Sequence, residues 1–176
     1  MNRRSIIFAS FLAVGVVCVV GGIVWGAFTL HAHSEVVIDP NIYYPVTYVV
    51  DGDTFKVAVN QKEITVRVLG INTPETVDPR KPVECYGPEA SKQAKALLDG
   101  QKVRLVFNPN RETVDKYGRY LMYVYRDDRL FYNEIMIKNG YAREYTFGTP
   151  YSFQSEFRAD QKVAQKAKLG LWGVCK

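Results

Sequence analysis

Two groups of oxygen-bearing residues follow predicted strands at a spacing that could hold a metal ion. Asp53 comes directly after an Asp51-Gly52 turn, and Asn72-Thr73-Pro74-Glu75 follows residues 64–68, which alternate like a strand. If the two strands are neighbours, both groups lie at one end of a sheet. Carboxylate, amide and carbonyl oxygens are the ligands that Ca²⁺ and Mg²⁺ prefer. Taken alone, Asp-Gly turns and acidic proline-rich loops are more often ordinary surface features.

Two arginines could bring positive charge to the same place. Arg67 alternates with Val66 and Val68, so we expect it on the face of its strand that points away from the core. Arg119 stands at the start of a later predicted strand. Arginine forms bidentate hydrogen bonds to phosphate and stabilises the charge that develops in phosphoryl transfer. Each is an ordinary surface residue unless the fold brings it to the carboxylates.

The positions of the histidines exclude several kinds of active site. The chain has two, His31 and His33, and both precede residue 40. A Ser-His-Asp triad, a Cys-His pair or a histidine-ligated zinc ion is therefore excluded for residues 40–176.

An apolar segment near the start of the chain predicts a hydrophobic N-terminal helix. Residues 6–30 contain no charged side chain and follow Arg3-Arg4. About 20 apolar residues span a bilayer, and a basic flank favours the cytoplasmic side. We therefore expect residues 1–34 to be a signal-anchor, with a single membrane pass through residues 6–30 and an exported C-terminal domain. The alternative is a secreted protein whose signal peptide is cleaved near Ser34.

The formal charge of the chain points to no partner by itself. The net charge is +5, but residues 1–34 contribute Arg3 and Arg4 and no acid. That leaves 21 basic and 18 acidic residues, a net charge of +3, for residues 35–176. Binding of a polyanion would therefore depend on a few placed side chains and a bound cation rather than on bulk basicity.

Two cysteines, Cys85 and Cys175, belong to the part of the chain that we expect to be exported. An oxidising compartment permits a disulfide between them. It would close a loop of about 90 residues and stabilise the fold by about 4 kcal/mol in the chain-entropy model. The alternative is two unpaired buried thiols.

The elements that must position these residues form a small domain over residues 46–176. Residues 35–45 are expected to be a linker, because Pro40 and Pro45 oppose regular structure. Period-two alternation and tight turns predict five strands, at residues 46–50, 55–59, 64–68, 103–107 and 121–125. Helical patterns occur at residues 87–98, 133–138 and 153–168. We therefore expect an α+β, mainly β, domain built on a five-stranded OB-fold barrel with about three helices.

Seven short motifs occur in register between Val46 and Trp172. They are, in order, Val50-Asp51-Gly52-Asp53-Thr54, Arg67-Val68-Leu69-Gly70-Ile71-Asn72-Thr73-Pro74-Glu75, Tyr86-Gly87-Pro88-Glu89-Ala90, Asp115-Lys116-Tyr117-Gly118-Arg119, Asn133-Glu134, Asn139-Gly140-Tyr141-Ala142 and Gly170-Leu171-Trp172. One such motif would be a weak signal, but several in register are highly specific. Through them the sequence strongly resembles the thermonuclease (staphylococcal nuclease) family.

The resemblance implies a Ca²⁺-dependent endonuclease that cuts DNA and RNA with little sequence preference, breaks the P–O5′ bond and leaves 3′-phosphate ends. Carried over by motif, Asp53 and Asn72 would bind one Ca²⁺ through their side chains, and Thr73 through its carbonyl. No protein partner is expected, and the protein is expected to be a monomer.

The resemblance also implies roles for the remaining site residues. Glu75 would orient or deprotonate the attacking water. Arg67 and Arg119 would hold the phosphate and stabilise the transition state, and Arg119 would also favour the leaving oxygen. Tyr145 lies near a family position that packs on the nucleotide, and Tyr117 is close to the site; packing within the barrel explains both tyrosines as well.

The sequence departs from the best-known family member in two places. That member has aspartate where this chain has Asn72, which predicts weaker Ca²⁺ affinity or a shifted metal preference. It also lacks cysteines corresponding to Cys85 and Cys175.

Two competing interpretations concern what the domain does. The barrel could be a catalytically weak nucleic-acid-binding or scaffold module, but such relatives have typically lost the arginines or the glutamate, which are present here. A membrane-associated structural protein would not explain why the phosphate-handling residues occur together.

Overall fold

The computed structural model describes residues 36–176. The chain divides into two units, Met1–Ser34 and Glu35–Lys176. The membrane segment expected at residues 6–30 and the cleavage site expected near Ser34 lie outside the described residues. Within residues 36–176 there is no helix with the length and apolar character needed to cross a membrane.

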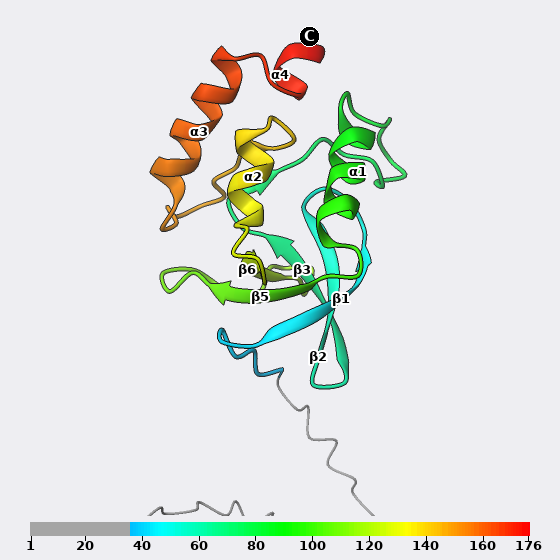
Figure 1. Ribbon diagram of the computed structural model, residues 1–176, viewed down its shortest axis with the longest axis vertical. Coiled ribbons are helices and arrows are strands. Elements are labelled where there is room, and N and C mark those ends of the chain that lie inside the picture. The colour runs from blue at the N-terminus through cyan, green and yellow to red at the C-terminus, as the bar shows by residue number, and fades with distance from the viewer. Residues whose placement is uncertain (1–35) are drawn as a thin grey trace, which may run out of the picture. The chain divides into compact units, whose positions relative to one another are not determined.

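Five strands form a closed barrel, as the sequence predicted (Figure 1). Their order around the barrel is β1-β2-β3-β6-β5, and β5 pairs with β1 to close it. The pairs are antiparallel except β3 with β6, which run parallel. The strands are β1 (Tyr43–Val49), β2 (Thr54–Val59), β3 (Lys62–Val68), β5 (Lys102–Phe107) and β6 (Tyr120–Arg126). A separate two-stranded sheet pairs β4 (Ile71–Asn72) with β7 (Arg143–Glu144).

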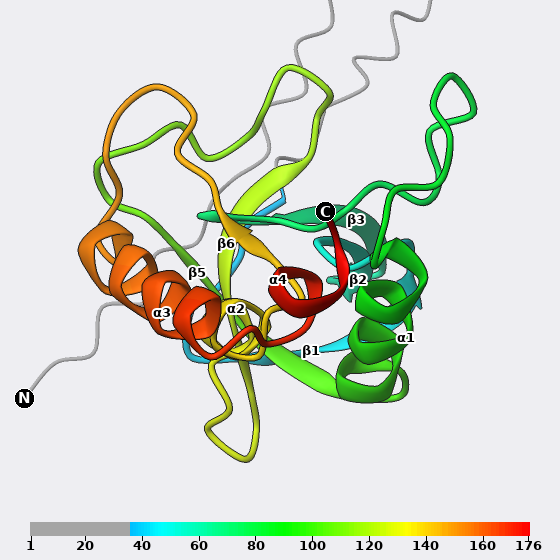
Figure 2. The same cartoon turned by 90° about the horizontal axis from the view of Figure 1, so that it is seen from above.

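Within residues 36–176, four helices accompany the barrel. They are α1 (Gly87–Leu98), α2 (Tyr132–Lys138), α3 (Gln154–Lys166) and α4 (Leu171–Val174). The first three match the predicted helices within two residues at each end, whereas α4 was not predicted. Seen from above, α2 and α4 lie between α3 and α1, and the loops at residues 73–86, 108–119 and 145–150 project on the same side (Figure 2).

The hairpin of β2 and β3 shows why the alternating pattern was informative. Alternate residues of both strands are buried because they fill the barrel, and these are Phe55, Val57, Val59, Ile64, Val66 and Val68. Asn60 and Gln61 both have positive φ, at 48° and 67°, as a two-residue turn of this hand requires.

Two sequence predictions about strands need correction. Pro45 does not end the linker but lies inside β1, where it is exposed and opposite Lys102. A bulge between Val46 and Tyr48 then shifts the alternation, so that Val49 is buried while Tyr48 is 58% exposed. In β6, the consecutive residues Met122, Tyr123 and Val124 are all buried, so this strand does not show the period-two alternation from which residues 121–125 were predicted.

Candidate active site

The turn before β2 places Asp53 inside a network of hydrogen bonds. Asp53 is only 6% exposed, and its Oδ1 accepts a hydrogen bond from the Thr54 hydroxyl at 3.0 Å. Its Oδ2 accepts one from the backbone N–H of Thr73 at 2.9 Å and lies 3.1 Å from Nη2 of Arg67. The carboxylate therefore joins β2, β3 and the start of the loop after β4.

Arg67 is fixed by main-chain and side-chain oxygens. Its Nη1 donates to the carbonyls of Val68 and Ile71, both at 2.8 Å, and its Nη2 donates to Oδ1 of Asn72 at 3.1 Å. Thr54 pairs with Arg67 in the barrel, so the antiparallel register of β2 and β3 brings Asp53 and Arg67 together. β2 and β3 are therefore neighbours, as the sequence led us to expect.

Close packing beneath the site depends on a glycine. The hydroxyl of Tyr132, a fully buried residue of α2, donates to the Gly52 carbonyl at 2.7 Å. A β-carbon added to Gly52 would lie 2.5 Å from Cγ2 of Thr73. Gly52 therefore lets the turn approach Thr73 closely enough for the backbone of Thr73 to reach Asp53.

Glu75 is held by the turn that follows it. Its Oε1 accepts hydrogen bonds from the backbone N–H groups of Thr76, Val77 and Asp78, at 2.8, 2.7 and 3.1 Å. These bonds, above all the one from Val77, lower the pKa of Glu75. Within the described part of the chain, Oε2 of Glu75 accepts no hydrogen bond, so this oxygen is free to meet a water molecule.

Arg119 reaches the site from the loop before β6. Its Nε donates to Oδ2 of Asp115 at 2.8 Å, and Nη2 lies 2.7 Å from the same oxygen. The guanidinium also lies 5.2 Å from the ring centre of Tyr117. Because β6 runs parallel to β3, with Val66 opposite Tyr120, Arg119 just before β6 and Arg67 in β3 come from adjacent segments of the chain.

A single cleft of about 1120 Å³ collects these side chains. All of the predicted metal, catalytic and stacking residues line it, namely Asp53, Arg67, Asn72, Thr73, Glu75, Tyr117, Arg119 and Tyr145. Tyr117 and Tyr145 are 70% and 46% exposed, so their rings are accessible at the cleft. Cys85 and Cys175 do not line the cleft; they form a disulfide.

A family model described as "Staphylococcal nuclease homologue" matches residues 65–174, more than half of the chain. The chain belongs to the staphylococcal nuclease family. A thermonuclease of Staphylococcus hyicus is 42% identical over 129 residues, which cover 73% of this chain and 75% of that protein. Endonuclease YncB of Bacillus subtilis is 41% identical over 124 residues, which cover 70% of this chain and 58% of that protein.

Asp51 is a cleft residue of this nuclease-family domain that the sequence reasoning did not select. Its Oδ1 accepts the backbone N–H of Asp53 at 2.9 Å. Burial, and next the charge of Asp53, raise the pKa of Asp51 to about 6. The sequence Asp51-Gly52-Asp53 could have indicated this role, since carboxylates two residues apart in a tight turn face a common space. Asp51 was predicted only as a turn residue.

Asp115, the partner of Arg119, was also missed as a site residue. It lines the cleft and accepts hydrogen bonds from the backbone N–H groups of Tyr117 and Arg119, at 2.8 and 3.0 Å. The acid thus shapes the loop of this family domain and orients its arginine at the same time.

A different acidic group lies between α2 and α3. Carboxylate oxygens of Glu134, Glu156 and Asp160 lie within 4.8 Å of one another. Lys138 forms an ion pair with Glu134 and lies 3.9 Å from Asp160, so a cation of the chain already neutralises part of this group. It contains no residue of the predicted site.

Proposed function

We propose that this protein is a Ca²⁺-dependent endonuclease that hydrolyses DNA and RNA with little sequence preference and leaves 3′-phosphate ends. Membership of the staphylococcal nuclease family supports a nuclease, that is, a phosphodiester hydrolase that acts on nucleic acid. The similarity to proteins named thermonuclease and endonuclease points the same way.

One observation supports the proposal most directly: a single cleft is lined by Arg67, Arg119, Glu75 and the buried Asp53, whose carboxylate lies 3.1 Å from Nη2 of Arg67. The two guanidinium groups supply fixed donors for the non-bridging oxygens of a phosphodiester. The carboxylate of Glu75 supplies a proton acceptor with one free oxygen.

The oxygen donors present fit a hard cation. Asp53 offers a carboxylate, Asn72 an amide oxygen and Thr73 a backbone carbonyl, and these are ligands that Ca²⁺ takes. The nearby Asp51 and Asp53 carboxylates repel one another, and a bound cation would offset that repulsion. When bound, Ca²⁺ would neutralise negative charge on the phosphate.

The remaining roles belong to residues of the chain. Glu75 orients a water molecule, or takes its proton, so that the water oxygen attacks phosphorus and the P–O5′ bond breaks. The departing O5′ takes a proton from solvent and becomes a 5′-hydroxyl, while the phosphate stays on the 3′ side. Arg67 and Arg119 stabilise the charge on the five-coordinate phosphorus, and Arg119 also favours the leaving oxygen.

The exposed rings at the cleft agree with a lack of sequence preference. Tyr117 and Tyr145 present faces on which bases can stack, and every base has such a face. The protein would act as a monomer. It would act outside the cytoplasm, anchored through residues 6–30 or released by cleavage near Ser34, because those residues have the composition of a signal-anchor.

The test is digestion of circular DNA and of RNA by the full-length protein in mild detergent, with Ca²⁺ or with a chelator. We expect cleavage only with Ca²⁺, products with 3′-phosphate and 5′-hydroxyl ends, and strongly reduced cleavage by the Glu75→Ser and Arg119→Ala variants. Cleavage that persists in chelator, or in both variants, would overturn this mechanism. Binding of nucleic acid without any cleavage would favour the catalytically weak binding module.

A further inference from the structure

The loop between β4 and α1 carries Glu75 near its start and Glu84 near its end, and the two are joined. The backbone N–H of Glu75 donates to Oε2 of Glu84 at 3.1 Å. The backbone N–H of Glu84 donates to the Glu75 carbonyl at 2.9 Å. Glu84 thus accepts one hydrogen bond from the Glu75 main chain and donates one to it, and the two bonds hold the main chain from which the Glu75 side chain extends.

The residue after Glu84 is covalently tied to the C-terminal end of the domain. Cys85 forms a disulfide with Cys175, with 5.8 Å between their α-carbons. Cys175 directly follows α4, whose first residue, Leu171, is buried and donates its N–H to the Gly140 carbonyl at 2.9 Å. The disulfide thus anchors the end of the loop to a packed part of the protein.

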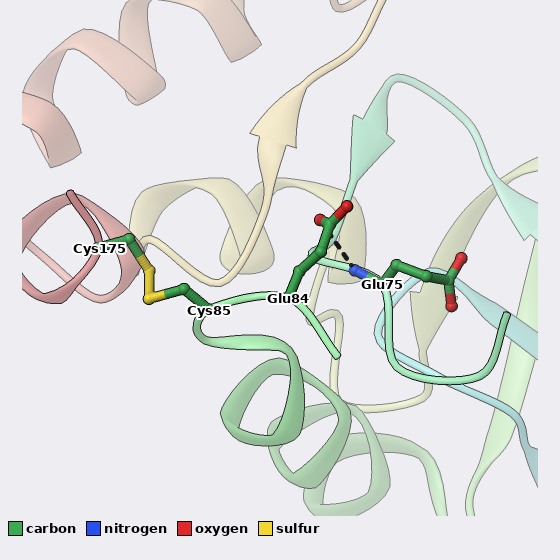
Figure 3. The surroundings of a disulfide bond; sticks show 4 residues. All are labelled: Glu75, Glu84, Cys85 and Cys175. Carbon is green, nitrogen blue, oxygen red and sulfur yellow. Dashed lines mark hydrogen bonds between the residues drawn. A yellow bond between two sulfur atoms is a disulfide. The ribbon is translucent and has the colours of Figure 1, made fainter. Parts of the chain in front are cut away.

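Figure 3 shows the resulting chain of contacts. Glu84 lies between the disulfide and Glu75, and its carboxylate points toward the Glu75 nitrogen. The Glu75 carboxylate points the other way, away from the disulfide. Glu84 is exposed and does not line the cleft, so it does not meet the phosphate itself.

We propose that Glu84 is a positioning residue for Glu75 and that the Cys85–Cys175 disulfide holds Glu84 in place, so that nuclease activity depends on the oxidation state of this cysteine pair. The inference rests on the proposed nuclease function. Glu84 acts through the Glu75 main chain, whereas Arg67 and Arg119 are held by other contacts and keep their places when the disulfide opens.

The disulfide lies where a reductant or an oxidant in solution can change its oxidation state. Cys85 is exposed, so a dithiol can reach its sulfur. The dithiol supplies two electrons and two protons; the S–S bond breaks, two thiols form on the protein and the dithiol becomes a disulfide. A disulfide oxidant reverses the reaction. Once the bond is open, Glu84 keeps its two hydrogen bonds to Glu75 and accepts one from the backbone N–H of Gly87 at 3.0 Å, and water competes for the exposed bond to its carboxylate.

The first test measures nuclease kinetics of the full-length protein on DNA with Ca²⁺, before and after treatment with dithiothreitol. We expect kcat to fall roughly tenfold to a hundredfold on reduction, with KM little changed, because a misplaced Glu75 affects the chemical step. Glu84→Ala should give a similar loss in the oxidised protein. Glu84→Gln keeps an acceptor oxygen and should retain most of kcat. Glu89→Ala, a nearby exposed acid on α1, is the matched control and should change neither constant.

The second test separates positioning from general damage to the fold. In a Glu75→Gln background, whose residual activity no longer uses the carboxylate, neither dithiothreitol nor Glu84→Ala should lower kcat further. An equal loss with and without Glu75, or a loss that appears as raised KM, would overturn the proposal. So would unchanged kcat after complete reduction.

A readout independent of catalysis distinguishes this proposal from the proposed function. Amide hydrogen exchange of Thr76, Val77 and Asp78 should be slow in the oxidised protein and faster after reduction or in Glu84→Ala, but not in Glu89→Ala. If exchange responds in this way and the oxidised protein cleaves no nucleic acid, the nuclease function fails while the positioning of Glu75 stands. If the oxidised protein cleaves DNA and exchange does not respond, the positioning proposal alone fails.

Discussion

The cleft has two parts that hold their side chains in different ways. The strand half contains Asp53 and Arg67, at β2 and β3, and the loop half contains Glu75 and Arg119. Arg67 belongs to β3 and Asp53 directly precedes β2; their side chains are 13% and 8% exposed, and they form an ion pair. Arg119 has a side chain that is 31% exposed, and Glu75 is held by the N–H groups of the next three residues. The strand half is therefore part of what stabilises the fold, whereas the loop half can be altered while the barrel stays intact.

Because of this difference, we expect substitution of Arg67 to lower both stability and nuclease activity, and by the largest amounts. Arg67→Ala leaves Asp53 buried without its cation, so we expect the free energy of unfolding to fall by about 3 kcal/mol. Nuclease activity should fall by roughly 10³-fold or more. Urea denaturation and single-turnover cleavage measure the two effects. Lys56→Ala, which breaks an ion pair with Glu63 whose two side chains are 39% and 48% exposed and which lies outside the cleft, should change neither appreciably.

Arg119→Ala should separate activity from stability. We expect nuclease activity to fall by roughly 10²- to 10³-fold, because a fixed donor to the transition state is lost. The free energy of unfolding should change by less than about 1 kcal/mol, because the ion pair with Asp115 is partly exposed. Arg119→Lys restores the charge without the bidentate geometry and should recover only part of the activity. A loss of stability as large as that of Arg67→Ala would erase the distinction between the two halves.

Gly52→Ala tests the point where the turn of the strand half meets the loop half. The new β-carbon would press on Thr73, so we expect a loss of about 1–3 kcal/mol in unfolding free energy and a lower kcat. Gly100→Ala is the matched control, since its φ of +69° strains an alanine but no atom lies within 4 Å of the added carbon. It should cost stability without altering kcat, and an equal fall in kcat would show that the Thr73 contact does not matter.

The smallest predicted effect concerns the metal. Asn72→Asp adds a negative charge among the oxygen donors, so the Ca²⁺ concentration for half-maximal activity should fall by roughly tenfold. Titration of cleavage against Ca²⁺ measures it. Half-activation of the unaltered protein at trace Ca²⁺ would contradict the expectation that Asn72 weakens the site.

The sequence predicted best those features that depend on neighbours along the chain. Alternation fixed β2 and β3 because each strand has one side in the core, and it identified Arg67 by its place on the other side. Pro45 was misjudged because its strand pairing depends on β5, a distant segment. The two-residue strands β4 and β7 are too short to leave any periodic pattern.

In the cleft, the sequence identified the arginines and Glu75 but not the residues that hold them in place. The motifs identified the arginines and Glu75 by their resemblance to a family. Glu84 as the neighbour of Glu75, and Asp115 as the neighbour of Arg119, emerge only when the loops are folded back on themselves. The raised pKa of Asp51 likewise follows from burial, which no local pattern of the sequence reports.

The parallel pairing of β3 with β6 has a consequence for how the protein folds. The hairpin of β2 and β3 can form early because its strands are consecutive, but β6 must arrive from far along the chain, after β4, α1 and β5. Such distant pairings form late, since a long loop has to close first. Arg67 and Arg119 stand on opposite sides of this seam, so the ability to cut nucleic acid should emerge only with the slowest refolding phase, when the barrel closes.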